Sequence, residues 1–349
     1  MRVLVTGGAG FIGSAVVRAL LARGVERVGV IDALTYAANP ATLAAFDGRD
    51  DFRFFRGDIC DRATVASAIA AIQPDAILHL AAETHVDRSI DGPGVFVQTN
   101  LVGTQILLEA AEDWWRSLPD GRADRFRYLQ ISTDEVFGAL GPGDPPFTEA
   151  SPYRPRSPYA ASKAGADLLA RAWFETWGLP VILTNCSNNY GPYQHPEKLI
   201  PLMTLRGLRG ESLPVYGDGQ QVRDWLHVQD HADALLAVLD HGAVGETYLV
   251  GARAEATNLD IVHGICAALD RMNPQGAPHE KRMAHVEDRP GHDRRYAIDP
   301  SHIEQALGWR PKVRLEQGLE ETVSWYATHE DWWHPFLAGG ALNRRGRIA

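Results

Sequence analysis

A glycine-rich segment near the start of the chain constrains the fold more than any other feature. Residues 6–13 read T-G-G-A-G-F-I-G and join a short apolar run, Val3–Val5, to a helical pattern over Gly13–Arg23. Glycine permits a tight turn between strand and helix, and it lets backbone N–H groups approach a pyrophosphate at the helix N-terminus. The spacing G-x-x-G-x-x-G therefore predicts the first turn of a dinucleotide-binding sheet.

Short apolar runs alternate with helical patterns through the first half of the chain. Near-continuous apolar strands separated by helices are typical of a parallel sheet covered on both faces. We predict an α/β fold, a Rossmann-type doubly wound parallel sheet with a smaller α+β lobe. The expected strands are Val3–Val5, Val28–Ile31, Phe52–Phe55, Ala76–Leu80, Tyr128–Ile131 and Val181–Thr184, and the expected helices are Gly13–Arg23, Arg62–Ile72, Leu101–Arg116 and Pro158–Trp177.

The pattern changes after about residue 187, where Gly, Pro, Tyr and Arg become more frequent. A helical pattern at Gln229–His241 and a strand pattern at Thr247–Val250 are expected to return to the sheet. We predict a dinucleotide-binding domain of residues 1–187 plus about 228–250, and a smaller lobe of residues 188–227 and 251–330. Residues 331–349 would form a C-terminal tail, and its polar stretch at 343–347 is expected to fray.

Composition argues against several classes of protein. The formal charge of −10 argues against a nucleic-acid binder, which needs a basic face. The sequence has no run of about 18 apolar residues, so no membrane span is expected. Cys60, Cys186 and Cys266 are odd in number and far apart, so we expect buried free thiols in a reducing, cytoplasmic compartment.

Two other kinds of residue pair are interpreted as structural. His227 and His231 are four apart, but no third ligand accompanies them, so no metal site is expected. The pairs Trp114–Trp115 and Trp332–Trp333 are expected to pack internally or at an interface rather than to stack on bases.

An acidic residue, Asp32, stands at the end of the second predicted strand. A carboxylate there can accept hydrogen bonds from both ribose hydroxyls of adenosine and repels a 2′-phosphate, which favours NAD over NADP. Further contacts are expected after the next strands, at Asp58, Ile59 and Leu80–Ala82, because open α/β sheets bind ligands outside the carboxyl ends of their strands. The alternative is a purely structural glycine loop with Asp32 as a solvated turn residue.

Tyr159 and Lys163 are four residues apart and share one side of a helix if Pro158 opens it. A free phenol has a pKa near 10, and lowering it by about three units takes about 4 kcal/mol of preferential phenolate stabilisation. A lysine ammonium and a positive nicotinamide ring can supply much of this in a dry site. The phenolate would then take the proton of a substrate hydroxyl as hydride leaves. The alternative is a buried tyrosine beside a surface lysine.

The pair Asp134–Glu135 follows Thr133 at the end of the fifth predicted strand. Ser132–Glu135 also matches a capping box, so the pair can simply begin a helix. Glycine and proline crowd residues 138–146, however, and would stop such a helix early. We therefore expect both carboxyls on a loop over the cofactor crevice, as a separate proton acid and proton base.

Together these residues resemble the extended short-chain dehydrogenase/reductases and, within them, the dTDP-glucose 4,6-dehydratase family. The early glycine turn and Y-x-x-x-K are shared with the whole superfamily, and S-T-D-E-V at residues 132–136 looks like the dehydratases. The resemblance runs to about residue 330. It also includes Ala82–Ile90, Asn185–Pro192, Pro196–Pro201, Arg223–Trp225 and Asp288–Tyr296.

The resemblance implies conversion of dTDP-glucose to dTDP-4-keto-6-deoxyglucose and water, for deoxysugar pathways such as that of dTDP-rhamnose. Tyr159 would deprotonate the C4 hydroxyl while hydride passes to NAD, with Lys163 beside it and Thr133 on the same oxygen. Glu135 would remove the C5 proton and Asp134 would protonate the C6 hydroxyl. The hydride would then return to C6, so NAD would be tightly held and recycled. The two carboxyls must therefore differ in pKa.

The resemblance also implies binding residues and a partner. The cofactor residues would be Gly7, Gly10, Phe11, Ile12, Gly13, Asp32, Ala33, Leu34, Thr35, Asp58, Ile59, Leu80, Ala81, Ala82, Thr99, Tyr159, Lys163 and Asn189. The substrate residues would be Thr84, Thr133 and Asn188 at the sugar or its phosphates, and Lys198, Leu199, Pro214, Tyr216, Arg223, Asn258, Asp288, Arg289, Pro290, Gly291 and His292 on the nucleotide side. The helices that begin near Leu101 and Tyr159 would form a four-helix bundle with a second subunit, which gives a homodimer.

The chain departs from the family pattern in small ways. Phe137 stands where tyrosine is common, Ala38 stands where glycine is common, and the loop 138–148 is short, which bears on the lid over the sugar.

Rival functions remain open. UDP-sugar 4-epimerases lack the paired acids, and UDP-glucuronate decarboxylases resemble S-T-S-E-V. A non-catalytic NAD-sensing regulator would be expected to lose the tyrosine or the acids. Asp134 is therefore the discriminating residue.

Overall fold

The structure, a computed structural model, describes residues 1–288, 291–338 and 340. Its main feature is a seven-stranded sheet in which every neighbouring pair of strands is parallel. The strand order is β10-β6-β5-β4-β1-β2-β3, so the direction of winding reverses between β1 and β4. The strands are β1 Arg2–Thr6, β2 Arg27–Asp32, β3 Phe52–Arg56, β4 Ala76–His79, β5 Arg127–Thr133, β6 Val181–Cys186 and β10 Thr247–Val250. The predicted doubly wound sheet is confirmed, including the return of residues 247–250 to it.

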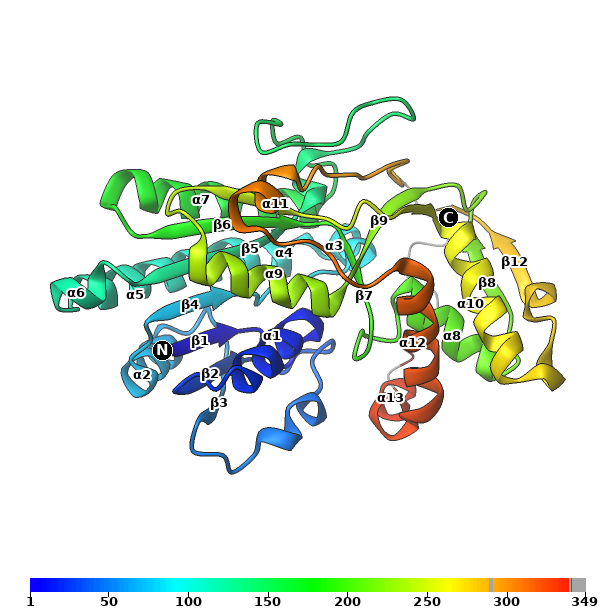
Figure 1. Cartoon of the computed structure of the whole chain (residues 1–349), viewed down its shortest axis with the longest axis horizontal. Helices are drawn as coiled ribbons and strands as arrows, with labels where there is room; N and C mark the ends of the chain where they lie inside the picture. Colours follow the sequence, from blue (N-terminus) through cyan, green and yellow to red (C-terminus); the bar gives the residue numbers. More distant parts are fainter. Residues whose placement is uncertain (289–290, 339, 341–349) are drawn as a thin grey trace.

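Helices cover both faces of this sheet (Figure 1). On one face, α1 Phe11–Ala22 packs against α9 Val228–His241. On the other, α2 Arg62–Ile72 packs against α5 Thr104–Arg116, and α5 packs against α7 Pro158–Trp177. Each face has its own cluster of buried apolar side chains. Shorter helices are α3 Val86–Asp91, α4 Pro93–Phe96, α6 Asp120–Ala123 and α11 Ser301–Leu307.

Local capping fixes where α7 begins and ends. The Ser157 hydroxyl accepts the Ala160 N–H at 3.0 Å, and Pro158 occupies the first helical position, where a missing N–H costs nothing. Gly178, with φ of 76°, ends the helix in the left-handed region. The predicted limits of this helix are confirmed, and they place Tyr159 and Lys163 in its first two turns.

Two predicted helix starts were wrong by two residues or more, and one predicted burial was wrong. α1 begins at Phe11 rather than Gly13, because the Ser14 N–H already donates to the Gly10 carbonyl. Helical backbone precedes Leu101 and runs from Pro93 through a π-helical turn, Val97–Gly103, into α5. Cys186 and Cys266 are buried as expected, but Cys60 is only half-buried.

The second half of the chain builds a smaller group of elements beside the sheet (right side of Figure 1). Its strands are β7 Asn188–Tyr190, β8 Leu213–Tyr216, β9 Val222–His227, β11 Glu255–Thr257 and β12 Met283–Val286. They form a three-stranded sheet, β11-β9-β7, and a parallel pair, β12-β8. The helices α8 Leu199–Leu208, α10 Asn258–Met272 and α12 Leu315–Thr328 pack together over a third apolar cluster.

The last described helix, α13 Glu330–Leu337, begins at the last residue of the predicted second lobe and continues into the predicted tail. Trp332 and Trp333 are buried there with Tyr326 and Leu205, so this tryptophan pair packs internally as predicted. Trp114 and Trp115 pack half-buried against the core beneath α5. The stretch at 343–347 lies outside the described residues.

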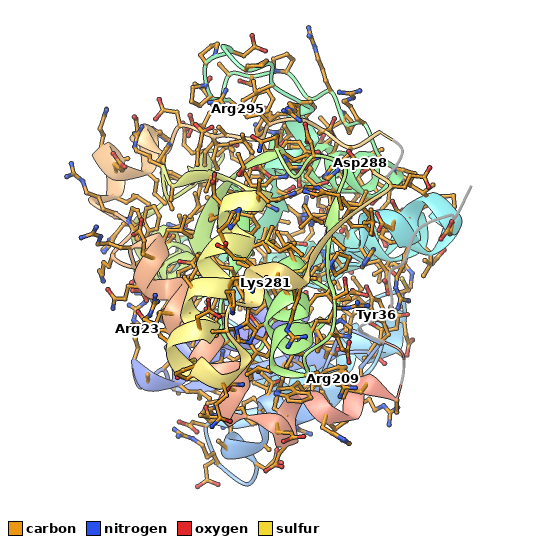
Figure 2. All side chains as sticks on the ribbon, turned by 90° about the vertical axis from the view of Figure 1, so that its right-hand side faces the viewer. Arg23, Tyr36, Arg209, Lys281, Asp288 and Arg295 are labelled. Carbon is orange, nitrogen blue, oxygen red and sulfur yellow. The ribbon has the colours of Figure 1, made fainter. Side chains whose placement is uncertain are left out.

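The short loop 138–148 is fastened to a segment near the end of the second lobe. The Leu140 N–H donates to the Arg295 carbonyl at 3.0 Å, and the Phe147 N–H donates to the Ala297 carbonyl at 2.9 Å. The guanidinium of Arg295, near the top of Figure 2, also donates to both carboxylate oxygens of Glu255 at 2.6 and 2.8 Å. This loop is therefore held at both of its ends.

Candidate active site

The strands β1, β2, β4, β5 and β6 point their carboxyl ends at one cavity of about 310 Å³. Every described residue predicted for the cofactor lines this cavity except Leu34. Leu34 has φ of 53°, and its N–H donates to the Asp32 carboxylate at 2.8 Å, so it orients that carboxylate instead. The residues predicted to be catalytic also meet at this cavity, which is lined by Thr133, Asp134, Glu135, Tyr159 and Lys163.

The glycine turn leaves no room for side chains. Gly7 has φ of 72°, and a Cβ there would lie 2.7 Å from the Ala81 backbone. A Cβ on Gly13 would lie 2.1 Å from the Gly7 carbonyl oxygen. The turn sits at the N-terminus of α1, where free N–H groups and the helix dipole favour an anion. This geometry fits the pyrophosphate of a dinucleotide.

Gly13→Ala should abolish cofactor retention. Since the clash is with backbone atoms, the turn must shift, and we expect a loss of about 1–3 kcal/mol of stability together with loss of co-purifying dinucleotide. Thermal unfolding and chromatography of the released cofactor measure both effects. Gly121→Ala is the matched control, because a Cβ there meets nothing within 4 Å. Full dinucleotide content in Gly13→Ala would contradict the assignment of this turn.

Asp32 is held in place by two backbone donors. Its carboxylate accepts the Ala9 N–H at 2.9 Å and the Leu34 N–H at 2.8 Å. Burial raises the pKa of Asp32, while these two donors oppose the shift. The carboxylate keeps further lone pairs for ribose hydroxyls, as the NAD prediction requires.

The redox pair is buried at the start of α7, where both residues line the cavity. Lys163 is 4% exposed and its Nζ donates to the Ile131 carbonyl at 2.8 Å. Burial, followed by the negative charge of Glu135, raises the pKa of Tyr159 well above its ordinary value. These surroundings therefore favour the neutral phenol. Positive charge must therefore lower the pKa of Tyr159 for catalysis. A cationic nicotinamide ring bound beside the lysine would supply such charge.

The acidic pair forms one turn of 3₁₀ helix, Asp134–Phe137, rather than the predicted open loop. Thr133, not Ser132, caps this turn, since its hydroxyl accepts the Glu135 N–H at 3.3 Å. The strand has ended by Asp134, so both carboxyls reach the same cavity. Glycine at 138, with φ of 92°, stops the turn as the sequence pattern predicted.

Burial distinguishes the two acids. Asp134 is 2% exposed, and burial followed by the charge of Glu135 raises its pKa well above its ordinary value. Its Oδ2 has no hydrogen-bond partner among the residues described. Burial thus favours the protonated form of Asp134, which is the form that a proton donor needs. Glu135 is half-buried beside it.

The predicted substrate residues fall into two groups. Thr84, Thr133, Asn188 and Lys198 line the cavity. The others lie outside its lining on the second lobe, namely Leu199 on α8, Pro214 and Tyr216 on β8, Arg223 on β9, Asn258 on α10, and Asp288, Gly291 and His292 after β12. Arg289 and Pro290 lie outside the described residues. Binding at all of these positions stays a prediction.

Some residues of the second group nevertheless contact one another. The His292 Nδ1 lies 2.6 Å from the Asp288 carboxylate, and the His292 ring packs edge-on against Tyr216. Arg223 is buried, lies 4.4 Å over the Tyr296 ring, and acts electrostatically on Asp134. Arg223 therefore links the second lobe to the acidic pair.

Several residues of the site escaped the sequence prediction. Cys186, Ser187, Gln194, His195 and Glu197 line the cavity. Glu197 could have been predicted from the sequence, because its carboxylate lies between the predicted contacts Asn189 and Lys198. Cys186 could not, because nothing in the sequence distinguishes it from other strand residues. No cluster of metal-ligating side chains is found in the described part of the chain. Within that part, no helix is long and apolar enough to cross a membrane.

The parallel sheet, the glycine turn and the Tyr159–Lys163 pair define an extended short-chain dehydrogenase/reductase. A family model described as GDP-mannose 4,6 dehydratase matches residues 4–322. A dTDP-glucose 4,6-dehydratase of Xanthomonas campestris pv. campestris is 56% identical over 96% of each chain. The chain belongs to this sugar-nucleotide dehydratase family, among the dTDP-glucose 4,6-dehydratases.

Solved structures agree on the fold. The dTDP-glucose 4,6-dehydratase DesIV of Streptomyces venezuelae, solved with NAD and dTDP bound, aligns with a TM-score of 0.88 and 48% identity over 96% of this chain and all of its own. A UDP-glucose 4-epimerase of Thermus thermophilus aligns with a TM-score of 0.82 and 31% identity, over 94% of this chain and 100% of its own. Fold alone therefore does not separate the dehydratase from the epimerase.

Proposed function

We propose that the protein is a dTDP-glucose 4,6-dehydratase that converts dTDP-glucose to dTDP-4-keto-6-deoxyglucose and water. One observation carries the choice of reaction: Asp134, a carboxyl whose pKa is raised by burial, and a second carboxyl, Glu135, share the cavity with Tyr159. An epimerase needs only the redox pair, whereas elimination of water needs an acid and a base besides it. The relatives named dTDP-glucose 4,6-dehydratase support the same choice.

The residues of the chain divide the work by position. NAD, when bound against the glycine turn and Asp32, supplies reversible hydride transfer. Tyr159 takes the proton of the sugar C4 hydroxyl, and Thr133 binds the same oxygen. The C4 ketone acidifies the C5 proton, which Glu135 removes. Asp134 gives its proton to the C6 hydroxyl, and water leaves.

Turnover in deuterated water tests the proposal. With dTDP-glucose we expect a 4-keto-6-deoxy product that carries deuterium at C5 and, at C6, the hydrogen that began at C4 of the same molecule. Mass spectrometry and NMR of the product locate both. Recovery of only a C4 epimer would show an epimerase, and binding of NAD without any turnover would show a sensor.

We also propose that the two lobes bind different ligands, and that the protein works in the cytoplasm. Residues 1–187 with about 228–250 would hold NAD, and residues 188–227 with 251–330 would hold the nucleotide. The separate apolar cluster beneath α8 and α10 supports such a second lobe. All three cysteines are free thiols, which supports a reducing compartment such as the cytoplasm.

A homodimer through α5 and α7 is the further part of the proposal. Five of the seven large, exposed apolar side chains found among the described residues lie on α7 or on the helical segments that precede α5: Ile90 on α3, Val95 on α4, Val97 at the start of the π-helical turn, and Leu168 and Trp177 on α7. α7 also packs against α3, α4 and α5, so these positions belong to one helical layer. Exposed apolar patches of this kind mark interaction surfaces. A twofold axis here would assemble four helices from two subunits.

The double variant Val97→Glu, Leu168→Glu should be monomeric at micromolar concentration. Each burial of such a side chain is worth about 1.5–3 kcal/mol, and a twofold interface contains each one twice. Sedimentation velocity measures the change from a dimer to a monomer. Met272→Glu, at an exposed apolar position on α10, is the control and should stay dimeric. A monomeric wild-type protein would exclude the interface.

A further inference from the structure

A buried carboxylate lies behind the redox pair, and the proposed reaction does not use it. Asp167 is 0% exposed and stands on α7 one turn after Lys163. Its Oδ2 accepts the Ser132 hydroxyl at 2.6 Å, the Tyr153 hydroxyl at 3.2 Å and the Asn185 amide at 3.5 Å. These donors come from β5, from the segment before α7, and from β6. Three separate elements thus converge on one acid that does not line the cavity.

The ammonium of Lys163 needs such a partner. A buried cation is costly unless an opposite charge compensates it, and the one hydrogen bond shown for Lys163 goes to the neutral Ile131 carbonyl. Burial lowers the pKa of Lys163, and the carboxylate of Asp167 opposes that shift more than any other group.

Apart from Asp167, no described group near Lys163 supplies the negative charge that would compensate it. Burial raises the pKa of the Cys186 thiol to about 12, so it carries no charge at neutral pH. Burial lowers the pKa of His79, on β4, to about 3, so this ring is neutral as well. Arg171, the next turn along α7, acts on Tyr153 and donates to Thr247. The negative charge that compensates Lys163 therefore comes from Asp167.

We propose that Asp167 is a positioning residue that keeps Lys163 an ammonium ion, and that Lys163 in turn favours the phenolate of Tyr159 during C4 oxidation. This inference rests on the proposed function for its catalytic part. Tyr159, Lys163 and Asp167 follow one another at intervals of four residues along α7, so Lys163 lies between the other two on one side of the helix. Asp167 thus acts through Lys163.

The sign of the effect separates this role from the alternatives. If Asp167 acts through Lys163, loss of the Asp167 charge would favour the neutral amine of Lys163, and this would raise the pKa of Tyr159. A direct action of Asp167 on the phenolate would give the opposite sign, because removing a nearby anion lowers a phenol's pKa. A purely structural role would lower the rate equally at every pH.

The lysines of the chain allow a direct test that needs no substrate. Only four occur in the sequence, Lys163, Lys198, Lys281 and Lys312. In NAD-loaded protein labelled with ¹³C at the lysine ε-carbon, Asp167→Asn should lower the titration midpoint of Lys163 by about one pH unit or more. Lys163→Ala assigns the signal. Glu175→Gln, the same change at an exposed position of α7, should leave the midpoint unmoved. An unchanged or raised midpoint in Asp167→Asn would overturn the proposal.

The pH dependence of kcat/KM for dTDP-glucose gives the catalytic readout. In Asp167→Asn the midpoint of the acid limb should move to higher pH. Tyr153→Phe keeps the carboxylate but removes a donor that stabilises its ionised form, so it should move the midpoint in the same direction by less. A uniform loss of rate, or a move to lower pH, would overturn the role.

Tyr153→Phe keeps the proposal testable if Asp167→Asn does not fold. Since burial raises the pKa of Asp167 to about 6, the wild-type carboxylate is itself lost in mildly acidic solution. Lysine titration in wild-type protein does not depend on turnover. Failure of the dehydratase activity and failure of this inference are therefore distinguishable.

Discussion

Tyr159→Phe should lower kcat for dTDP-glucose by about 10³- to 10⁴-fold while KM changes little. The substitution removes the group that takes the C4 proton, and positioned acid–base groups contribute about 10²–10⁴-fold each. The ring itself stays packed, since it lies edge-on to Phe96 at 6.3 Å between centroids. Steady-state kinetics with product detection by mass spectrometry measures the loss.

Tyr128→Phe is the matched control for that variant. Tyr128 is fully buried on β5, and its hydroxyl has no hydrogen-bond partner among the residues that the structure describes. Its removal should leave kcat unchanged. If Tyr159→Phe kept a tenth or more of the wild-type activity, another group would have to be the proton acceptor.

Asp134→Asn should slow complete conversion about 10²- to 10³-fold but slow C4 oxidation less than about tenfold. An amide keeps the shape of the neutral acid but has no proton to give to the C6 hydroxyl, so water cannot leave. Single-turnover absorbance of the cofactor reports C4 oxidation, and the 4-keto-6-deoxy product reports the whole cycle. Asp144→Asn, on the exposed loop that follows, should affect neither. Equal loss of both steps would mean that Asp134 mainly maintains the structure.

The same substitution should stabilise the fold at neutral pH. In the folded protein the pKa of Asp134 is raised above its value in the unfolded chain. The contribution of Asp134 to the free energy of unfolding is therefore most favourable below the unfolded-state pKa, and it is lost as the pH rises through the folded-state pKa. Asparagine does not titrate. The thermal midpoint of Asp134→Asn should therefore exceed that of the wild type near pH 7, and the difference should shrink as the pH falls towards about 4. An equal difference at every pH would contradict this linkage.

Where the sequence prediction succeeded, the signal was local and periodic. The strand at Thr247–Val250 and the helix at Pro158–Trp177 were predicted with their observed limits, because alternation of apolar runs and capping residues act over a few neighbours. It failed at Leu101, where the continuation through a π-helical turn depends on how residues 97–103 pack against α7. It also failed at Cys60, because burial depends on elements distant in the chain.

By itself, the sequence determined the doubly wound sheet and the glycine turn with Asp32, and it identified Tyr159–Lys163 and Asp134–Glu135 as the candidate catalytic pairs, since each is written in short motifs whose chemistry is fixed by residue type. Only the tertiary structure decided that Asp134 is the acid enclosed in the interior, where burial raises its pKa. Asp134 and Glu135 are adjacent in the chain, but β5 ends between Thr133 and Asp134 and turns one carboxyl into the protein interior and leaves the other half-buried. Only the structure also brought Asp167 against β5 and β6 behind Lys163. A pKa depends on the solvent and charges around a group, and those surroundings are assembled from segments that the sequence keeps far apart.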